Sequence, residues 1–281
     1  MVLNIAGRGA EQRTPAGWQA ELGLRFVRRR DRTVLSERRQ CGPLLVQRPF
    51  YPEDDGTCHT YLIHPPAGIV GGDDLRVDLD LEAGAHALVT TPAATRWYFS
   101  REPEASIRQC ARIAAGATLE WLPQETLVYG GARAQLTTRI EVEAGARFLG
   151  WEVLGLGRPA CGEEFRNGKL DFRFQIFRAG QPLLLERLRG DVNGVPGLRG
   201  YAAYATFVAT GAGARALECA REVLRSAPDS VGAATLIGDV LIGRSLAERC
   251  EPLTSALNRL WSALRPVILG RPAVAPRIWR T

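Results

Sequence analysis

Apolar and polar residues alternate along several stretches of the chain, and this alternation predicts β-strands. In residues 75–81, 136–142 and 170–176, every second residue is apolar or threonine, and the residues between are mostly charged or polar. Successive side chains of a strand point to opposite faces, so this is the pattern of half-buried strands. Residues 1–21 lack the pattern and are expected to form a loose N-terminal segment, with the chain strand-like from Leu22 onward.

A short repeat organises these predicted strands. The tripeptide Ala-Gly-Ala occurs at Ala83–Ala85, Ala115–Ala117 and Ala144–Ala146, at offsets of 32 and 29 residues. Each copy follows an alternating stretch and precedes an apolar run, and its glycine suits a tight turn. A strand–turn–strand unit that recurs about every 30 residues is typical of stacked β-layers. The sequence therefore predicts a mostly β protein, a β-helical or layered β-sheet scaffold.

The last quarter of the chain has a different pattern. Residues 214–225 show helical spacing, an apolar run suggests a strand near residues 233–242, and a second apolar stripe at helical spacing covers residues 253–264. Pro252 is suited to the first turn of that second helix, and Pro266 is expected to end it.

These patterns predict one domain over residues 22–281. A layered β part reaches to about residue 190, and a mixed α/β part with a few helices covers residues 200–281. A Gly- and Pro-rich loop over residues 191–200 joins the two parts.

Composition and charge narrow the class of protein. The chain carries 36 basic and 30 acidic residues, a net charge of +6, and Lys169 is its one lysine. The arginine clusters at residues 28–32 and 38–39 have no interleaved aromatic residues and match no nucleic-acid motif, so nucleic-acid binding is not expected. No stretch is long and apolar enough to span a membrane, and no secretory signal is evident, so we expect a cytoplasmic protein with six free thiols.

Residues 48–74 contain the most distinctive candidate chemistry. Cys58, His59 and His64 resemble metal ligands, but on one extended strand His59 and His64 face opposite sides. Cys58 and His64 share a side yet lie ~20 Å apart, at about 3.3 Å per residue. Ordinary strand positions are therefore favoured over a local chelate, with transient metal contact at Cys58 or His59 left as the alternative.

Catalytic motifs receive little support. Cys58 and His59 form a thiol–imidazole pair only in sequence, because neighbouring strand residues point apart. The glycine-rich segment 68–73 lacks the lysine and hydroxyl of a nucleotide-triphosphate loop and is expected to be a turn that presents Asp73 and Asp74. A hydrolase using Cys58 and His59 therefore stays only as an alternative, and no catalytic residue or resident cofactor is predicted.

Longer blocks of sequence resemble a known family. They run in order as GPLLVQRPFYPE at 42–53, CHTYLIHPPAGIVGGD at 58–73, GAHALVTTPAATRWYFS at 84–100, ATLEWLPQETLVYGGA at 117–132, WEVLGLGRPACGEEF at 151–165 and PRIW at 276–279. On these blocks the chain resembles the urease accessory protein D family (UreD, called UreH in some organisms). It departs from the commoner family form at Ala67 and Ala93, where glycine is frequent.

The resemblance implies a role without a reaction of its own. Proteins of this family help to load nickel into apo-urease during GTP-dependent maturation. The implied partners are apo-urease, the helical accessory protein UreF, the GTPase UreG and, indirectly, the nickel metallochaperone UreE. Nickel is expected only in transit.

The family is also proposed to conduct nickel through an internal polar passage. The matching motifs offer seven candidate path residues here: Glu53, Asp73, Glu125, Glu152, Glu163, Cys58 and His59. Separated carboxylates supply oxygen ligands without a closed cage, which suits transit. The alternative is an interaction scaffold without a metal route.

Overall fold

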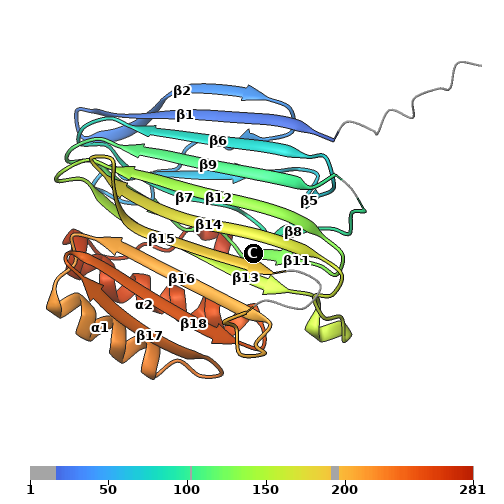
Figure 1. Cartoon of the computed structure of the whole chain (residues 1–281). Helices are drawn as coiled ribbons and strands as arrows, with labels where there is room; N and C mark the ends of the chain where they lie inside the picture. Colours follow the sequence, from blue (N-terminus) through green and yellow to red (C-terminus); the bar gives the residue numbers. More distant parts are fainter. Residues whose placement is uncertain (1–16, 102, 191–195, 281) are drawn as a thin grey trace, which may run out of the picture.

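Two β-sheets lie face to face, and two helices cover the outer face of one of them (Figure 1). The computed structural model describes residues 17–101, 103–190 and 196–280. The chain passes repeatedly between the two sheets, so that most strands of each sheet are parallel. This arrangement of stacked coils confirms the predicted fold class.

Sheet 1 has seven strands in the order β15-β14-β12-β9-β6-β1-β2. Their bounds are β1 Gln19–Arg29, β2 Arg32–Cys41, β6 Asp74–Leu81, β9 Ala105–Ile113, β12 Arg133–Val142, β14 Lys169–Arg178 and β15 Gln181–Gly190. The strands from β1 to β14 pair in parallel, and β2 and β15 close the two ends as antiparallel partners. The three predicted alternating stretches lie in β6, β12 and β14, with their apolar side chains buried.

Sheet 2 follows the path β17-β18-β16-β13-β10-β7-β4-β3, with three short strands beside it. The path comprises β3 Leu45–Val46, β4 Cys58–Ile63, β7 His86–Thr90, β10 Thr118–Trp121, β13 Arg147–Leu156, β16 Ala203–Thr210, β17 Val231–Ile237 and β18 Val240–Ala247. The short strands are β5 Gly68–Ile69, β8 Thr95–Trp97 and β11 Thr126–Val128.

The Ala-Gly-Ala repeat marks the turns that carry the chain from sheet 1 to sheet 2. Its three glycines all have positive φ, from 71° to 78°. The repeat offsets equal the register of the parallel strands: Asp74 pairs with Ser106 and His86 with Thr118, 32 residues apart, whereas Ala105 pairs with Ala134, 29 residues apart. Each repeat is therefore one coil of the stack.

Two apolar cores result from this layering. The larger core fills the space between the sheets and includes Phe26, Trp97 and Phe148. The second core lies between sheet 2 and the helices and includes Phe207 and Trp261. A residue on sheet 2 therefore faces either the interior of the stack or the helical layer, according to its position along the strand.

The C-terminal part confirms both predicted helices and corrects the strand between them and the end of the second helix. Helix α1 covers Ala214–Arg225 as predicted. The expected single strand over residues 233–242 is wrong: β17 and β18 form a hairpin that turns at Gly238, whose φ is +59°. Two 3-10 helices, Pro159–Cys161 and Arg277–Arg280, complete the fold.

Helix α2 covers Cys250–Leu269 and contains Pro266, so the prediction that Pro266 ends the helix is also wrong. A proline inside a helix removes one backbone hydrogen bond. Here the neighbouring turn is held by packing, because Leu264 and Arg265 are fully buried against sheet 2.

The N-terminal boundary also shifts. Strand β1 begins at Gln19 and Ala20 is buried, because this end of β1 pairs with β6. The remainder of the predicted loose segment, residues 1–16, and part of the predicted joining loop, residues 191–195, lie outside the described residues. Within the described ranges, neither helix is both long and apolar enough to cross a membrane.

Candidate functional site

A row of polar side chains lies inside the stack, between the two sheets. Gln109 on β9 and Thr138 on β12 are paired in register on sheet 1. The Thr138 hydroxyl lies 2.8 Å from Gln109 Oε1 and also within hydrogen-bond distance of Glu152 on β13. A hydroxyl donates only one proton, so a protonated Glu152 that donates to Thr138 satisfies both contacts.

The environment of Glu152 favours that protonated form. Burial, together with the negative charge of Glu186, raises the pKa of Glu152 to about 7, although a hydrogen bond donated by Thr138 to the ionised form would lower it. Both carboxyl groups line a cavity of about 30 Å³ between the sheets. The polar row therefore contains two acidic side chains beside a small space that water can occupy.

The row reaches the surface through Glu186 on β15. Its carboxylate accepts a 2.8 Å hydrogen bond from Thr206 Oγ1 and a short one from the Tyr204 hydroxyl. Arg244 on β18 closes the end of the row, with Nη2 3.0 Å from Glu186 Oε2. The row thus passes from half-buried Gln109 and buried Thr138 to Arg244 at the surface.

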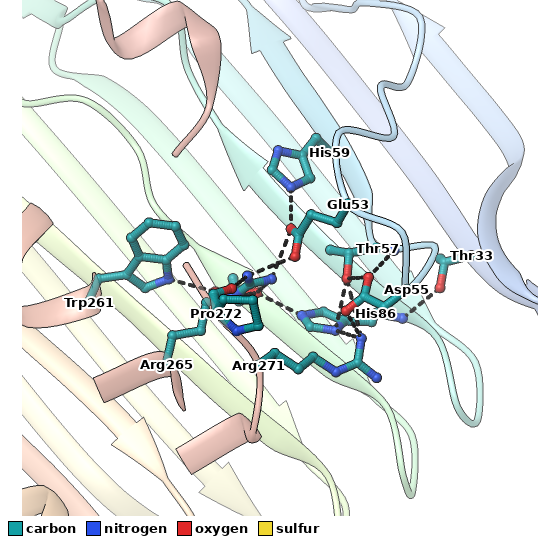
Figure 2. Close-up of polar contacts among 11 residues, drawn as sticks. Thr33, Glu53, Asp55, Thr57, His59, His86, Trp261, Arg265, Arg271 and Pro272 are labelled. Carbon is teal, nitrogen blue, oxygen red and sulfur yellow. Dashed lines mark hydrogen bonds and ion pairs between the residues drawn. The ribbon is translucent and has the colours of Figure 1, made fainter. Parts of the chain in front are cut away.

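A second polar cluster lies on the other face of sheet 2, under helix α2 (Figure 2). Glu120 on β10 is fully buried, and Trp261 Nε1 donates to it at 2.6 Å. Arg265 Nε donates at 3.0 Å and His86 Nε2 lies 2.7 Å away. Burial by itself would raise the pKa of Glu120, but His86, Arg265 and Trp261 together lower it to about 2.

Arg265 joins Glu120 to a second carboxylate. Its Nη1 and Nη2 donate to Glu53 at 2.7 and 2.9 Å, and Nη1 also donates to the carbonyl of Pro272. His59 Nε2 lies 2.6 Å from Glu53. Since the Arg265 side chain is fully buried, it is the internal counter-ion of both carboxylates.

The segment after α2 is attached to the same cluster. The guanidinium of Arg271 pairs with Asp55, and its Nη1 lies 3.2 Å from His86 Nδ1. Farther along, Trp279 Nε1 donates to Thr90 at 3.0 Å. The cluster therefore fixes the helical layer and the C-terminal segment to sheet 2, and we call it the α2 anchor.

The seven candidate path residues do not converge on one site. Glu152 lies in the polar row, whereas Glu53 and His59 belong to the α2 anchor. Asp73 is buried and accepts backbone N–H groups of Trp18 at 2.7 Å and Val70 at 3.0 Å, so it fixes a loop. The prediction that this turn presents Asp73 is therefore wrong.

The other three candidates lie elsewhere. Glu163 accepts the Gly130 N–H at 2.9 Å and pairs with Arg158 near the surface. Glu125 precedes β11, and its charge adds to burial in raising the pKa of Cys250 to about 12. Cys58 is fully buried, with Sγ 3.6 Å from Thr60 Oγ1, and burial raises its pKa.

These positions bear on the alternatives drawn from the sequence. His59 directs Nε2 to Glu53, so it leaves Cys58 without an imidazole base and gives no support to a hydrolase. In the ranges 17–101, 103–190 and 196–280, no three His, Cys, Asp or Glu side chains are grouped to hold a metal ion. His64 is not part of either cluster, and burial lowers its pKa.

Sequence reasoning missed the partners that define both clusters. The sequence could have indicated that Glu186 faces the interior, because it stands two residues from both Leu184 and Leu188 on one strand, and these leucines pack in the core between the sheets. No sequence pattern indicates the role of Arg265, since it stands 145 residues from Glu120 and 212 residues from Glu53 in the sequence.

Comparisons with known proteins identify the family. A sequence model of the UreD urease accessory protein family matches residues 19–280. The chain is 49% identical over 279 residues to the urease accessory protein UreD of Pseudomonas entomophila, covering 99% of this chain and all of that protein. It is 46% identical to UreD of Alcanivorax borkumensis, over 94% of this chain and 93% of that protein. The corresponding protein of Citrobacter koseri is 42% identical, with 94% and 92% covered. The chain therefore belongs to the UreD family of urease accessory proteins.

Proposed function

We propose that this protein acts in the GTP-dependent incorporation of nickel into urease. It scaffolds the accessory complex on apo-urease, and its polar row conducts nickel between the two sheets. The observation that carries the passage is the pair Glu152 and Glu186 beside a cavity inside the stack. Family membership supports the role in urease maturation.

The chemistry of the row suits transit of a divalent cation. Glu152 and Glu186 offer carboxylate oxygens, and Thr206 and Tyr204 offer hydroxyl oxygens. Nickel binds imidazole and thiolate more strongly than oxygen, so an oxygen-lined row holds it weakly and releases it onward. In this proposal nickel is cargo, and the chain keeps no resident metal.

The partners follow from the same proposal. Apo-urease receives the nickel, the helical protein UreF and the GTPase UreG join the chain in the accessory complex, and UreE supplies the metal upstream. GTP hydrolysis belongs to UreG. The complex works in the cytoplasm.

A second candidate function is an interaction scaffold without a metal route. The cavity favours this alternative, because about 30 Å³ holds little more than one water molecule. The distribution of the candidates favours it as well, since only Glu152 of the seven lies in the row.

Urease activation in vitro separates the two functions. The assay combines apo-urease, UreF, UreG, UreE, GTP and nickel with the wild-type chain, Glu152→Gln or Glu186→Gln. Glu163→Gln is the control, because it removes a carboxylate at the surface, away from the row.

A passage predicts slower activation by both row variants and normal activation by Glu163→Gln. Normal activation by all three, with each variant folded, leaves only the scaffold. If activation does not depend on the chain at all, the maturation role itself fails.

A further inference from the structure

Arg244 sits at the surface end of the polar row in a position to control entry. On β18 it pairs in register with Thr206 of β16, the residue that donates to Glu186. Its Nε lies 3.3 Å from Glu186 Oε1 and its Nη2 3.0 Å from Oε2. One guanidinium therefore covers both oxygens of the outer carboxylate of the row.

The two carboxyl groups of the row differ in their counter-ions. Among the described residues, Arg244 is the one basic side chain in an ion pair with Glu186, and Glu152 is in none. The charge of Arg244 therefore balances Glu186, while Glu152 has no basic partner among the described residues. A cation that moves inward must first displace the Arg244 guanidinium from Glu186.

We propose that Arg244 is the gate residue of this passage, which a divalent cation enters by replacing the Arg244 guanidinium on Glu186. The inference rests on the proposed passage and adds its mode of entry. In the exchange, the guanidinium moves into solvent on its tether and the cation takes both oxygens of Glu186. One tethered positive charge leaves Glu186, and the additional charge of the cation lies beside the carboxyl group of Glu152, which lines the same cavity.

Exposure makes this exchange feasible. The Arg244 side chain is 48% exposed and that of Glu186 14%, so water reaches the guanidinium in its paired position. Exposed ion pairs of this kind are weak. Arg265 in the α2 anchor makes the same type of contact, but it is fully buried and has no room to leave. The two arginines thus have different roles, a mobile gate and a fixed anchor.

The gate also selects by charge. A monovalent cation on Glu186 only replaces the single charge that Arg244 already supplies, so the exchange yields little binding free energy. A divalent cation adds one positive charge between two carboxyl groups and is favoured by their combined field. We therefore expect Ni²⁺ to exchange with Arg244, and Na⁺ and K⁺ to be excluded.

Arg187 provides a matched control. It pairs with Asp171 on the outer face of sheet 1, with Nη2 2.6 Å from the carboxylate. Its side chain is 48% exposed and that of Asp171 14%, the same values as for Arg244 and Glu186. Asp171 also pairs with Arg173, so removing Arg187 leaves that carboxylate with one arginine. Each removal takes one charge from an ion pair of the same exposure, but only Arg244 faces the row.

The test is titration of the full-length chain with nickel chloride by isothermal calorimetry, in buffers of different ionisation enthalpy. Loss of a weak competing pair should tighten Ni²⁺ binding by about two- to fivefold in Arg244→Gln. Arg187→Gln and Arg244→Lys should bind as the wild type does. The double variant Arg244→Gln with Glu186→Gln should lose the gain.

The gate is overturned if Arg244→Gln binds Ni²⁺ as the wild type does, if Arg187→Gln gives the same gain, or if the double variant retains it. Thermal unfolding of each variant verifies that the chain is folded. The passage is judged separately, from urease activation by Glu152→Gln. Impaired activation there with unchanged Ni²⁺ binding in Arg244→Gln refutes the gate alone, whereas normal activation refutes the passage.

Discussion

Replacement of Arg265 by methionine should be the most damaging single change in the helical layer. The substitution keeps an unbranched side chain of similar length but removes the charge that lies between Glu120 and Glu53. Both carboxylates then stay buried with only neutral donors and histidines around them. Breaking a buried ion pair in this way typically costs about 3–5 kcal/mol.

That loss should be visible as a lower melting temperature. At about 2–4 °C per kcal/mol for a chain of this size, Arg265→Met should melt ~6–20 °C below the wild type. Thermal unfolding followed by circular dichroism measures the shift, and urea unfolding measures the free energy. Arg271→Met is the control, because its partly exposed pair with Asp55 should contribute no more than about 1 kcal/mol.

The pH dependence gives a second, independent check. In the folded wild type the pKa of Glu120 is about 2, whereas in the unfolded chain it is about 4.3. The ionised carboxylate therefore stabilises the fold fully above about pH 4.3, and this stabilisation is lost as the pH falls through 2. In Arg265→Met the guanidinium no longer lowers the pKa of Glu120, so that pKa rises, although His86 and Trp261 still oppose burial. The deficit of the variant should therefore shrink as pH falls and Glu120 becomes protonated. A loss below about 1 kcal/mol, or a deficit independent of pH, would refute the reasoning.

Four further outcomes are expected. Because the pKa of Glu152 is raised to about 7, its ionisation lowers stability as pH rises from about 4.5 to 7, so Glu152→Gln should melt above the wild type at pH 8 and close to it at pH 5. Equal differences at the two pH values would contradict this. Asp73→Asn should cost about 1–3 kcal/mol and speed hydrogen exchange at the two amides that the carboxylate accepts, and unchanged exchange would speak against the loop-fixing role. Buried Cys58 should resist alkylation in the native protein while exposed Cys161 reacts, as peptide mapping by mass spectrometry would reveal; early labelling of Cys58 would disprove its burial. Ala67 has a φ of +57°, a strained conformation for alanine that glycine adopts freely, but glycine also makes the unfolded chain more flexible. The net effect of Ala67→Gly should be a free energy of unfolding about 0.5 kcal/mol higher, measured in urea. A lower free energy of unfolding would show that the turn is unstrained.

Local patterns predicted the parts of the fold that local physics determines. Alternation in β6, β12 and β14 follows from one buried strand face, and the Ala-Gly-Ala turns require a left-handed residue that glycine supplies. The hairpin of β17 and β18 was missed because residues 233–242 were interpreted as one apolar run, although Gly238-Asp239 within it is a two-residue turn signal. Pro266 wrongly predicted the end of α2, because a proline destabilises the helical turn in which it lies. The packing of α2 against sheet 2 outweighs that cost, and it involves residues distant in the sequence.

The candidate site was harder to predict because carboxylates take their roles from distant partners. Glu53, Asp73 and Glu152 look alike in sequence, yet they meet an arginine, two backbone amides and a threonine, respectively. Of these partners, Arg265 is 212 residues from Glu53. Charge type and spacing along the chain identify none of these environments, because each depends on which strands the coils bring together.

The coil lengths have a consequence for how the sequence can change. From the last residue of the sheet 1 strand to the first of the sheet 2 strand, each Ala-Gly-Ala turn has the same length, Leu81 to His86, Ile113 to Thr118 and Val142 to Arg147. The three-residue difference between the 32- and 29-residue coils therefore lies entirely in the opposite arcs, which contain β8 and β11. Deletion of one residue at an Ala-Gly-Ala turn would shift a strand by one position and turn its apolar face outward. Insertions in the opposite arcs, outside the paired residues of β8 and β11, leave the strand pairing intact. The Ala-Gly-Ala side of the stack and the opposite side are therefore free to diverge at very different rates.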